Sequence, residues 1–221
     1  MSDVLDYGTK AALSGNATSL VVFLHGYGAD GRDLLGLADP LAEHLPNTVF
    51  VAPDAPERSA MNPAGFQWFP IPWIDGSSEA AAAEGLARAV IDLNAFLDHV
   101  MAEHGVTAAE TALVGFSQGT MISLHAAPRR DAAFAGVVGF SGRLLDPEAL
   151  VDEVVVRPPV LLIHGDADDV VPPQSLPEAA EGLEAAGWEE VYAHVMQGMA
   201  HGIAPDGLSV ALAFLRDKLP D

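Results

Sequence analysis

The chain has 221 residues and a mass of 23.0 kDa, which fits one domain spanning residues 1–221, since single cores stop growing near ~250 to 300 residues. Half of the residues are apolar and the mean hydropathy is +0.24, which excludes a disordered chain. Lys plus Arg number 10 against 31 Asp plus Glu, a net charge of −21. Such a field repels phosphate backbones and anionic lipids, so we expect no nucleic-acid partner and no stable membrane association.

The chain contains no cysteine, which excludes disulfides, thiolate metal sites and cysteine nucleophiles. Residues 1–6 are acidic and lack the basic end and apolar stretch of a signal peptide. No run of ~18 uninterrupted apolar residues follows. We therefore expect a cytoplasmic, soluble protein.

Short apolar runs alternate with longer helical patterns along the chain. The predicted strands cover residues 20–24, 48–51, 111–114, 136–140, 160–164 and 191–196. The predicted helices cover residues 32–44, 85–101, 118–126, 176–186 and 208–218. Nearly continuous apolar strands are typical of a sheet covered on both faces, and intervening helices imply parallel pairing. The fold class is thus α/β, a three-layer sandwich with a mostly parallel central sheet.

One segment breaks this alternation. Residues 53–76 contain five prolines together with Phe66, Trp68, Phe69 and Trp73. The prolines exclude a regular helix or a central strand, so we expect a long ordered excursion over the surface. Loops of this length are often functional.

The most specific motif is Gly115-Phe116-Ser117-Gln118-Gly119, between a predicted strand and a predicted helix. In this context Gly-x-Ser-x-Gly predicts a nucleophile elbow, in which flanking glycines allow close backbone approach and the serine hydroxyl stands above the sheet. The alternative is a serine that only caps the helix.

A serine nucleophile requires a base and an acid that orients the base, expected here in the chain order acid, then histidine. The loop after residues 160–164 offers three candidate acids, which we rank Asp168, then Asp166, then Asp169. Asp166 is better placed to cap the turn, and Asp168 occupies the loop tip.

Of eight histidines, His201 alone lies in a glycine-rich loop after the acid, so it is the predicted base. His164 precedes the acid, which is the wrong order for the base. No pair of histidines has metal-ligand spacing, so we expect no metal site and no cofactor.

Acyl transfer also needs backbone donors for the oxyanion. The N–H of Gln118 follows the nucleophile, and the N–H of Tyr27 lies in the loop Leu24-His25-Gly26-Tyr27-Gly28. We assign these two donors. A phosphate-binding loop is the alternative, but no lysine stands beside these glycines.

These motifs, with Ala52-Pro53-Asp54-Ala55-Pro56 and Gly198-Met199-Ala200-His201, resemble the phospholipase/carboxylesterase family of α/β-hydrolases over nearly the whole chain. The family includes bacterial carboxylesterases and acyl-protein thioesterases. The resemblance implies Ser117, Asp168 and His201 as the triad, with Tyr27 and Gln118 as oxyanion donors. Its His-Gly-x-x-Asp arrangement favours Asp168 as the acid.

Only residues 142–158 separate Ser141 from the next strand, too few for a large lid domain, so we expect an open site. Phe66, Trp68, Ile71 and Trp73 are its predicted substrate-binding wall; the alternative is that these residues seal an edge of the core. The predicted function is a serine carboxylesterase acting on small-molecule esters. Alternatives are an acyl-protein thioesterase or lysophospholipase with the same triad, and a binding protein without turnover. The sequence is compatible with a homodimer and does not fix the oligomeric state.

Overall fold

The structure is a computed structural model that describes residues 4–220. Its centre is a seven-stranded sheet in the order β1-β3-β2-β6-β7-β8-β9. The strands are β1 (Tyr7–Lys10), β2 (Ser19–Leu24), β3 (Thr48–Pro53), β6 (Thr111–Phe116), β7 (Gly136–Phe140), β8 (Val160–Gly165) and β9 (Val191–Met196). β1 pairs antiparallel with β3, and the other neighbours are parallel. A separate hairpin joins β4 (Glu57–Arg58) to β5 (Phe66–Gln67).

Helices follow most of the strands. They are α1 (Gly31–Leu35), α2 (Ala38–Ala42), α3 (Pro72–Asp75), α4 (Glu79–His104), α5 (Gln118–Ala126), α6 (Pro147–Glu153), α7 (Ser175–Ala185) and α8 (Pro205–Lys218), with short 3-10 helices η1 (Ala108–Glu110) and η2 (Ala127–Arg129). No helix within residues 4–220 is long and apolar enough to cross a membrane.

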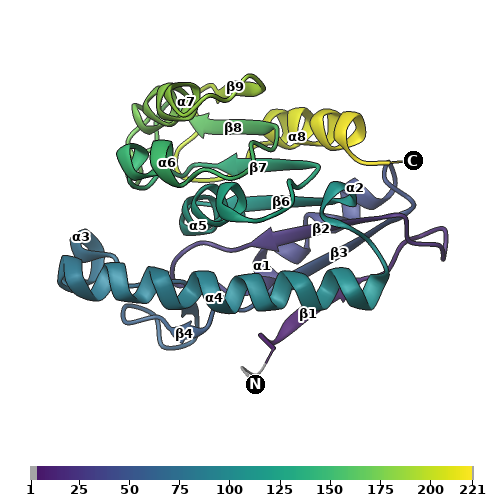
Figure 1. Cartoon of the computed structure of the whole chain (residues 1–221), viewed down its shortest axis with the longest axis horizontal. Helices are drawn as coiled ribbons and strands as arrows, with labels where there is room; N and C mark the ends of the chain where they lie inside the picture. Colours follow the sequence, from purple (N-terminus) through teal and green to yellow (C-terminus); the bar gives the residue numbers. More distant parts are fainter. Residues whose placement is uncertain (1–3, 221) are drawn as a thin grey trace.

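The sheet is covered by helices on both faces (Figure 1). All six residues of β2 are buried, with Leu20, Val22 and Leu24 in one apolar cluster and Val21 and Phe23 in another. The first cluster includes side chains of α4, α5, α6 and α7, and the second includes side chains of α1, α2 and α8. The predicted three-layer α/β sandwich with a mostly parallel sheet is confirmed, and it explains why the central strands have no polar face.

Three local predictions need correction. The single helix expected over residues 32–44 is two short helices, because Pro40 has no N–H to continue α1 and instead sits in the first turn of α2. The segment from 53 to 76 does contain regular structure: the β4–β5 hairpin and α3, which begins at Pro72. Strand β1 was not predicted.

The carboxyl ends of the parallel strands lie at one edge of the sheet, where the arrowheads of β2, β7 and β8 point in Figure 1. Strand β6 ends next to Ser117, β8 ends before the loop with Asp168, and β9 ends before the loop with His201. Parallel topology therefore brings three distant segments to a common edge.

Candidate active site

Ser117 occupies the turn between β6 and α5. Its backbone has φ 53° and ψ −113°, in the positive-φ region that a residue with a side chain rarely adopts. The surrounding chain holds this strained conformation: the Ser117 N–H donates to the Phe140 carbonyl at 2.8 Å, and its carbonyl accepts from the Met121 N–H at 3.1 Å. Ser117 is 8% exposed, so its side chain retains limited access from outside.

The two glycines of the motif are required by close backbone packing. A Cβ on Gly119 would lie 1.8 Å from the Leu24 carbonyl oxygen, and a Cβ on Gly115 would lie 2.5 Å from the Gly119 carbonyl carbon. Both separations are far inside van der Waals contact. The predicted close backbone approach at the elbow is confirmed. The two glycines allow α5 to pack directly against β2 and β6.

Asp168 is 4% exposed and its carboxylate is fully engaged. Oδ1 accepts from the N–H groups of Val170 and Val171, each at 2.9 Å, and Oδ2 lies 2.7 Å from Nδ1 of His201. Burial opposes ionisation of this carboxyl group, but the hydrogen bonds from His201, Val171 and Val170 outweigh burial. The pKa of Asp168 therefore lies below its ordinary value, and the group is a carboxylate at neutral pH.

His201 is held between Asp168 and the residue before the candidate nucleophile. Because a carboxylate can only accept, Nδ1 of His201 carries the proton of their hydrogen bond, which leaves Nε2 of the neutral ring as an acceptor. The Phe116 ring packs against the imidazole at 4.9 Å between centroids. The structure thus brings the Asp168–His201 pair to the β6–α5 turn.

The other two candidate acids are exposed. Asp166 Oδ1 accepts from the Gly198 N–H at 2.6 Å, and the Ala167 N–H donates to the Met199 carbonyl at 3.0 Å. Asp166 therefore ties the loop after β8 to the loop after β9, a task that differs from holding the imidazole.

The loop that contains Tyr27 is fixed by a buried histidine. Nε2 of His25 accepts from the Ala55 N–H at 3.0 Å, so Nδ1 donates to the Gly26 carbonyl at 2.7 Å. Burial lowers the pKa of His25, which agrees with this neutral ring.

The two predicted oxyanion donors are backbone N–H groups. Gln118 is the first residue of α5, where the N–H groups have no partner within the helix. Among residues 4–220 the Tyr27 N–H also has no backbone acceptor.

Comparison with known proteins identifies the family. A family model described as Phospholipase/Carboxylesterase matches residues 11–219. The chain belongs to the phospholipase/carboxylesterase family. Its members are serine hydrolases that act on ester bonds.

Individual relatives support this membership. A crystal structure of esterase PE8 superimposes with a TM-score of 0.92 at 43% identity, covering 98% of this chain and 100% of that chain. Esterase YpfH from Escherichia coli (strain K12) is 28% identical over 205 residues, 92% of this chain and 84% of that protein. Acyl-protein thioesterase 1 from Debaryomyces hansenii is 25% identical over 230 residues, 99% of each chain.

In this family member the side chain of Gln118 has a structural task. Its Oε1 accepts from the Trp68 N–H at 2.9 Å, and its Nε2 donates to the Phe69 carbonyl at 2.7 Å. Gln118 is fully buried. The residue after the elbow serine thus fastens the proline-rich segment to the site.

The four residues of the predicted substrate wall have different environments. Trp68 has 0% exposure, and its indole N–H donates to the His25 carbonyl at 3.0 Å. It belongs to the core, which corrects its place in the wall. The Phe66 ring packs beneath the Arg58 guanidinium, with 4.1 Å between Arg58 Cζ and the ring centroid. Ile71 and Trp73, which is 57% exposed, line a cavity of about 180 Å³ with Leu86 and Leu145.

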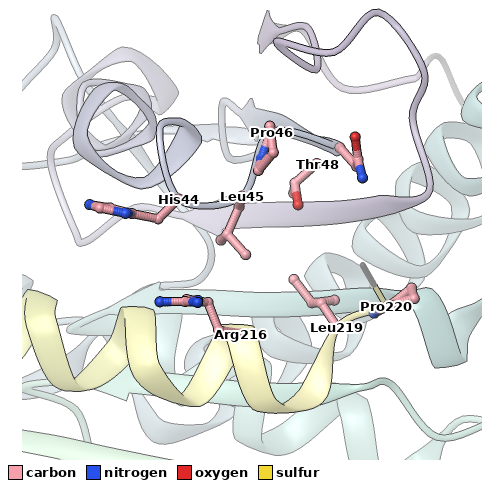
Figure 2. Close-up of a pocket in the computed structure, with 8 residues that line it drawn as sticks. His44, Leu45, Pro46, Thr48, Arg216, Leu219 and Pro220 are labelled. Atoms are coloured by element: carbon pink, nitrogen blue, oxygen red, sulfur yellow. The ribbon is translucent and has the colours of Figure 1, made fainter.

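Another cavity, of about 110 Å³, lies where β3 begins, away from the carboxyl edge of the sheet. Figure 2 shows residues of the α2–β3 connection facing the end of α8 across it: His44, Leu45, Pro46, Thr48, Arg216, Leu219 and Pro220. It contains none of the candidate catalytic residues. Within the described chain, no group of three or more His, Asp or Glu side chains could hold a metal ion.

Sequence reasoning missed two contacts of the triad candidates. Phe116 is the first of the two variable positions of Gly-x-Ser-x-Gly, and its ring packs against His201. His164 places Nε2 at 2.9 Å from the Val171 carbonyl and 3.3 Å from Asp168 Oδ2. The His-Gly-x-x-Asp spacing could have predicted the contact between His164 and Asp168, because the two residues lie four positions apart around one turn.

Proposed function

We propose that this protein is a serine carboxylesterase that hydrolyses small to medium carboxylic esters through an acyl-enzyme on Ser117. The observation that carries the proposal is the 2.7 Å pair of His201 Nδ1 and Asp168 Oδ2, packed through Phe116 against the strained turn of Ser117. A hydroxyl held at such a turn needs a nearby base to become a nucleophile, and an imidazole oriented by a carboxylate is such a base.

In the first half-reaction, His201 Nε2 takes the proton of the Ser117 hydroxyl while Oγ bonds to the ester carbonyl carbon. The tetrahedral intermediate collapses when the bond to the alcohol oxygen breaks, and that oxygen receives the proton from Nε2. Asp168 stays ionised and stabilises the imidazolium, a role that its lowered pKa favours.

In the second half-reaction, water replaces the alcohol. His201 accepts a proton from the water, whose oxygen bonds to the acyl carbon, and returns the proton to Ser117 Oγ as the acid leaves. The Tyr27 and Gln118 N–H groups would hold the oxyanion in both steps, a contribution of about 10²- to 10³-fold in rate for each donor. The reaction requires no cofactor, and we assign it to small-molecule esters in the cytoplasm.

We place the acyl chain in the cavity lined by Ile71 and Trp73. Its volume of about 180 Å³ is close to the ~150 Å³ of an apolar cavity that holds benzene. A cavity of this size suits a short or medium acyl group better than a long lipid chain. Phe66 is the remaining wall candidate, on the β4–β5 hairpin.

An acyl-protein thioesterase is the second candidate, because several relatives carry that name and the same triad would cleave a thioester. A panel of oxygen esters and thioesters with acyl chains of 2 to 16 carbons separates the two. We expect kcat/KM to peak at short or medium oxygen esters; a peak at long-chain thioesters or lysolipids would favour the alternatives.

The proposal is tested with Ser117→Ala. If the triad acts as a unit, kcat on a short aryl ester should fall by about 10⁶-fold. Ser209→Ala in α8, whose Oγ donates to the Pro205 carbonyl, is the matched control and should retain wild-type kcat. Near-full activity of Ser117→Ala would remove this serine from the mechanism.

A further inference from the structure

A third cavity lies near the candidate nucleophile. It has a volume of about 300 Å³ and shares no lining residue with the cavity at Ile71 and Trp73. Apolar side chains from the Tyr27 loop, α1, the α1–α2 link, the elbow and the loop after His201 make most of its wall. The lining residues are His25, Gly26, Ala29, Asp33, Leu34, Leu37, Phe116 and Ile203.

This cavity adjoins the reaction centre through Gly26 and Phe116. A Cβ built on Gly26 would lie 3.2 Å from Phe116 Cδ1 and 3.4 Å from Ser117 Cβ, so the lining glycine lies close to the candidate nucleophile. The Phe116 ring also contacts the His201 imidazole, and Ile203 follows His201 by two residues. Two lining residues therefore connect the cavity to His201, Phe116 by ring contact and Ile203 by its position in the chain.

The two halves of an ester have different positional needs. The acyl group stays bonded to Ser117, whereas the alcohol oxygen must reach the proton on His201 Nε2 when its bond to carbon breaks. The alcohol portion consequently belongs on the side of the imidazole. We propose that the cavity bounded by Leu37, Phe116 and Ile203 binds the alcohol portion of the substrate and selects compact apolar alcohols, aryl alcohols in particular. This inference rests on the proposed function.

Size and charge narrow the class of alcohol. A cavity of about 300 Å³ is about twice the ~150 Å³ that accommodates benzene, so a bicyclic aromatic group fits. Asp33 lies at the wall, and none of the lining residues is Lys or Arg. With a net charge of −21 on the chain, an anionic alcohol such as a phosphoglycerol is disfavoured.

The decisive variants change the volume of this cavity. Ile203→Trp fills it and should lower kcat/KM for 2-naphthyl acetate at least about tenfold relative to ethyl acetate. Leu37→Ala enlarges it and should shift the same ratio in the opposite direction. The matched control is Leu145→Trp in the other cavity, which should alter acyl-length preference and leave the naphthyl-to-ethyl ratio at the wild-type value.

A binding measurement separates this inference from the proposed function. Ser117→Ala should bind 2-naphthol in a fluorescence titration, and adding Ile203→Trp should weaken that binding at least about tenfold. If Ser117→Ala keeps full esterase activity, the proposed function fails. If Ser117→Ala is inactive but the cavity variants change neither the ester ratio nor 2-naphthol binding, the assignment of the alcohol site alone is overturned. The assignment would also be overturned if Ile203→Trp lowered kcat/KM equally for both esters and slowed deacylation, because that pattern indicates displacement of His201.

Discussion

At the residue scale, two aspartates separated by one residue have different tasks. Asp168 is buried and holds the His201 imidazole, whereas Asp166 is exposed and holds the Gly198 N–H. In Asp168→Asn the amide oxygen should remain on the Val170 and Val171 N–H groups, so the NH2 group faces His201 Nδ1 and donates to it. The imidazole is then held in the wrong tautomer, and kcat should fall by about 10⁴-fold.

Asp166→Asn is the matched control, because it changes the same loop by the same atoms. It should cost about tenfold at most, since one hydrogen bond is worth about 1 kcal/mol. Steady-state kinetics on one aryl ester checks both variants. A larger loss in Asp166→Asn than in Asp168→Asn would show that the acid was misassigned.

The sequence nominates candidate catalytic residues, but it does not predict the contacts that support them. Ser117, Asp168 and His201 are candidates because of motif, chain order and loop position, which can be read from the chain itself. The contacts of Phe116 with His201 and of His164 with Asp168 depend on how the ends of β6 and β8 meet the loops that carry His201 and Asp168. Trp68 was misplaced because aromatic content alone does not separate a substrate wall from a core.

At the scale of elements, the elbow depends on close packing of α5 against β2. Gly119→Ala would force a methyl group to 1.8 Å from the Leu24 carbonyl oxygen, so we expect a loss of about 3 kcal/mol in the free energy of unfolding. Gly36→Ala is the control, because Gly36 has φ −59° and no atom within 4 Å of a new Cβ. It should be neutral or stabilising by about 0.4–1 kcal/mol. Urea unfolding measures both, and equal effects would contradict the packing argument.

Helix α5 also contains a partly buried titratable group near its end. Burial, and then the charge of Arg129, lower the pKa of His125 to about 4, against ~6.5 in an unfolded chain. Between these values the unfolded chain binds a proton that the folded chain does not, so the free energy of unfolding decreases as pH falls through this window. His125→Gln removes this group and should reduce that decrease. Urea unfolding from pH 7 to pH 4.5 compares the two proteins; parallel pH dependences would exclude His125 as a contributor.

Central strands were predictable because burial on both faces requires continuous apolar residues. Strand β1 was not, since Tyr-Gly-Thr-Lys is a partly exposed edge strand without an apolar run. Helix α6 was also missed, although Asp146 followed by Pro147 is a helix-start signal: the Asp146 carboxylate accepts from the Ala149 N–H at 3.1 Å. Regular but short elements depend on tertiary contacts more than on pattern.

At the scale of the whole molecule, the net charge of −21 makes the folded chain repel itself. Raising the ionic strength from 0.01 M to 0.15 M shortens the Debye length from about 30 Å to about 8 Å. We expect Tm to rise by about 2–4 °C for each kcal/mol of repulsion that is screened. Thermal unfolding at fixed pH checks this, with NaCl and KCl as matched salts. An unchanged or lower Tm would show that ion pairs outweigh the repulsion.

The proposed mechanism requires that a covalent intermediate forms on Ser117. Peptide mapping after reaction with a fluorophosphonate probe tests this most directly. We predict one labelled peptide carrying the adduct on Ser117, no such label in Ser117→Ala, and much slower labelling in His201→Ala. Absence of label from the folded wild-type protein, or label on a different serine, would contradict the account.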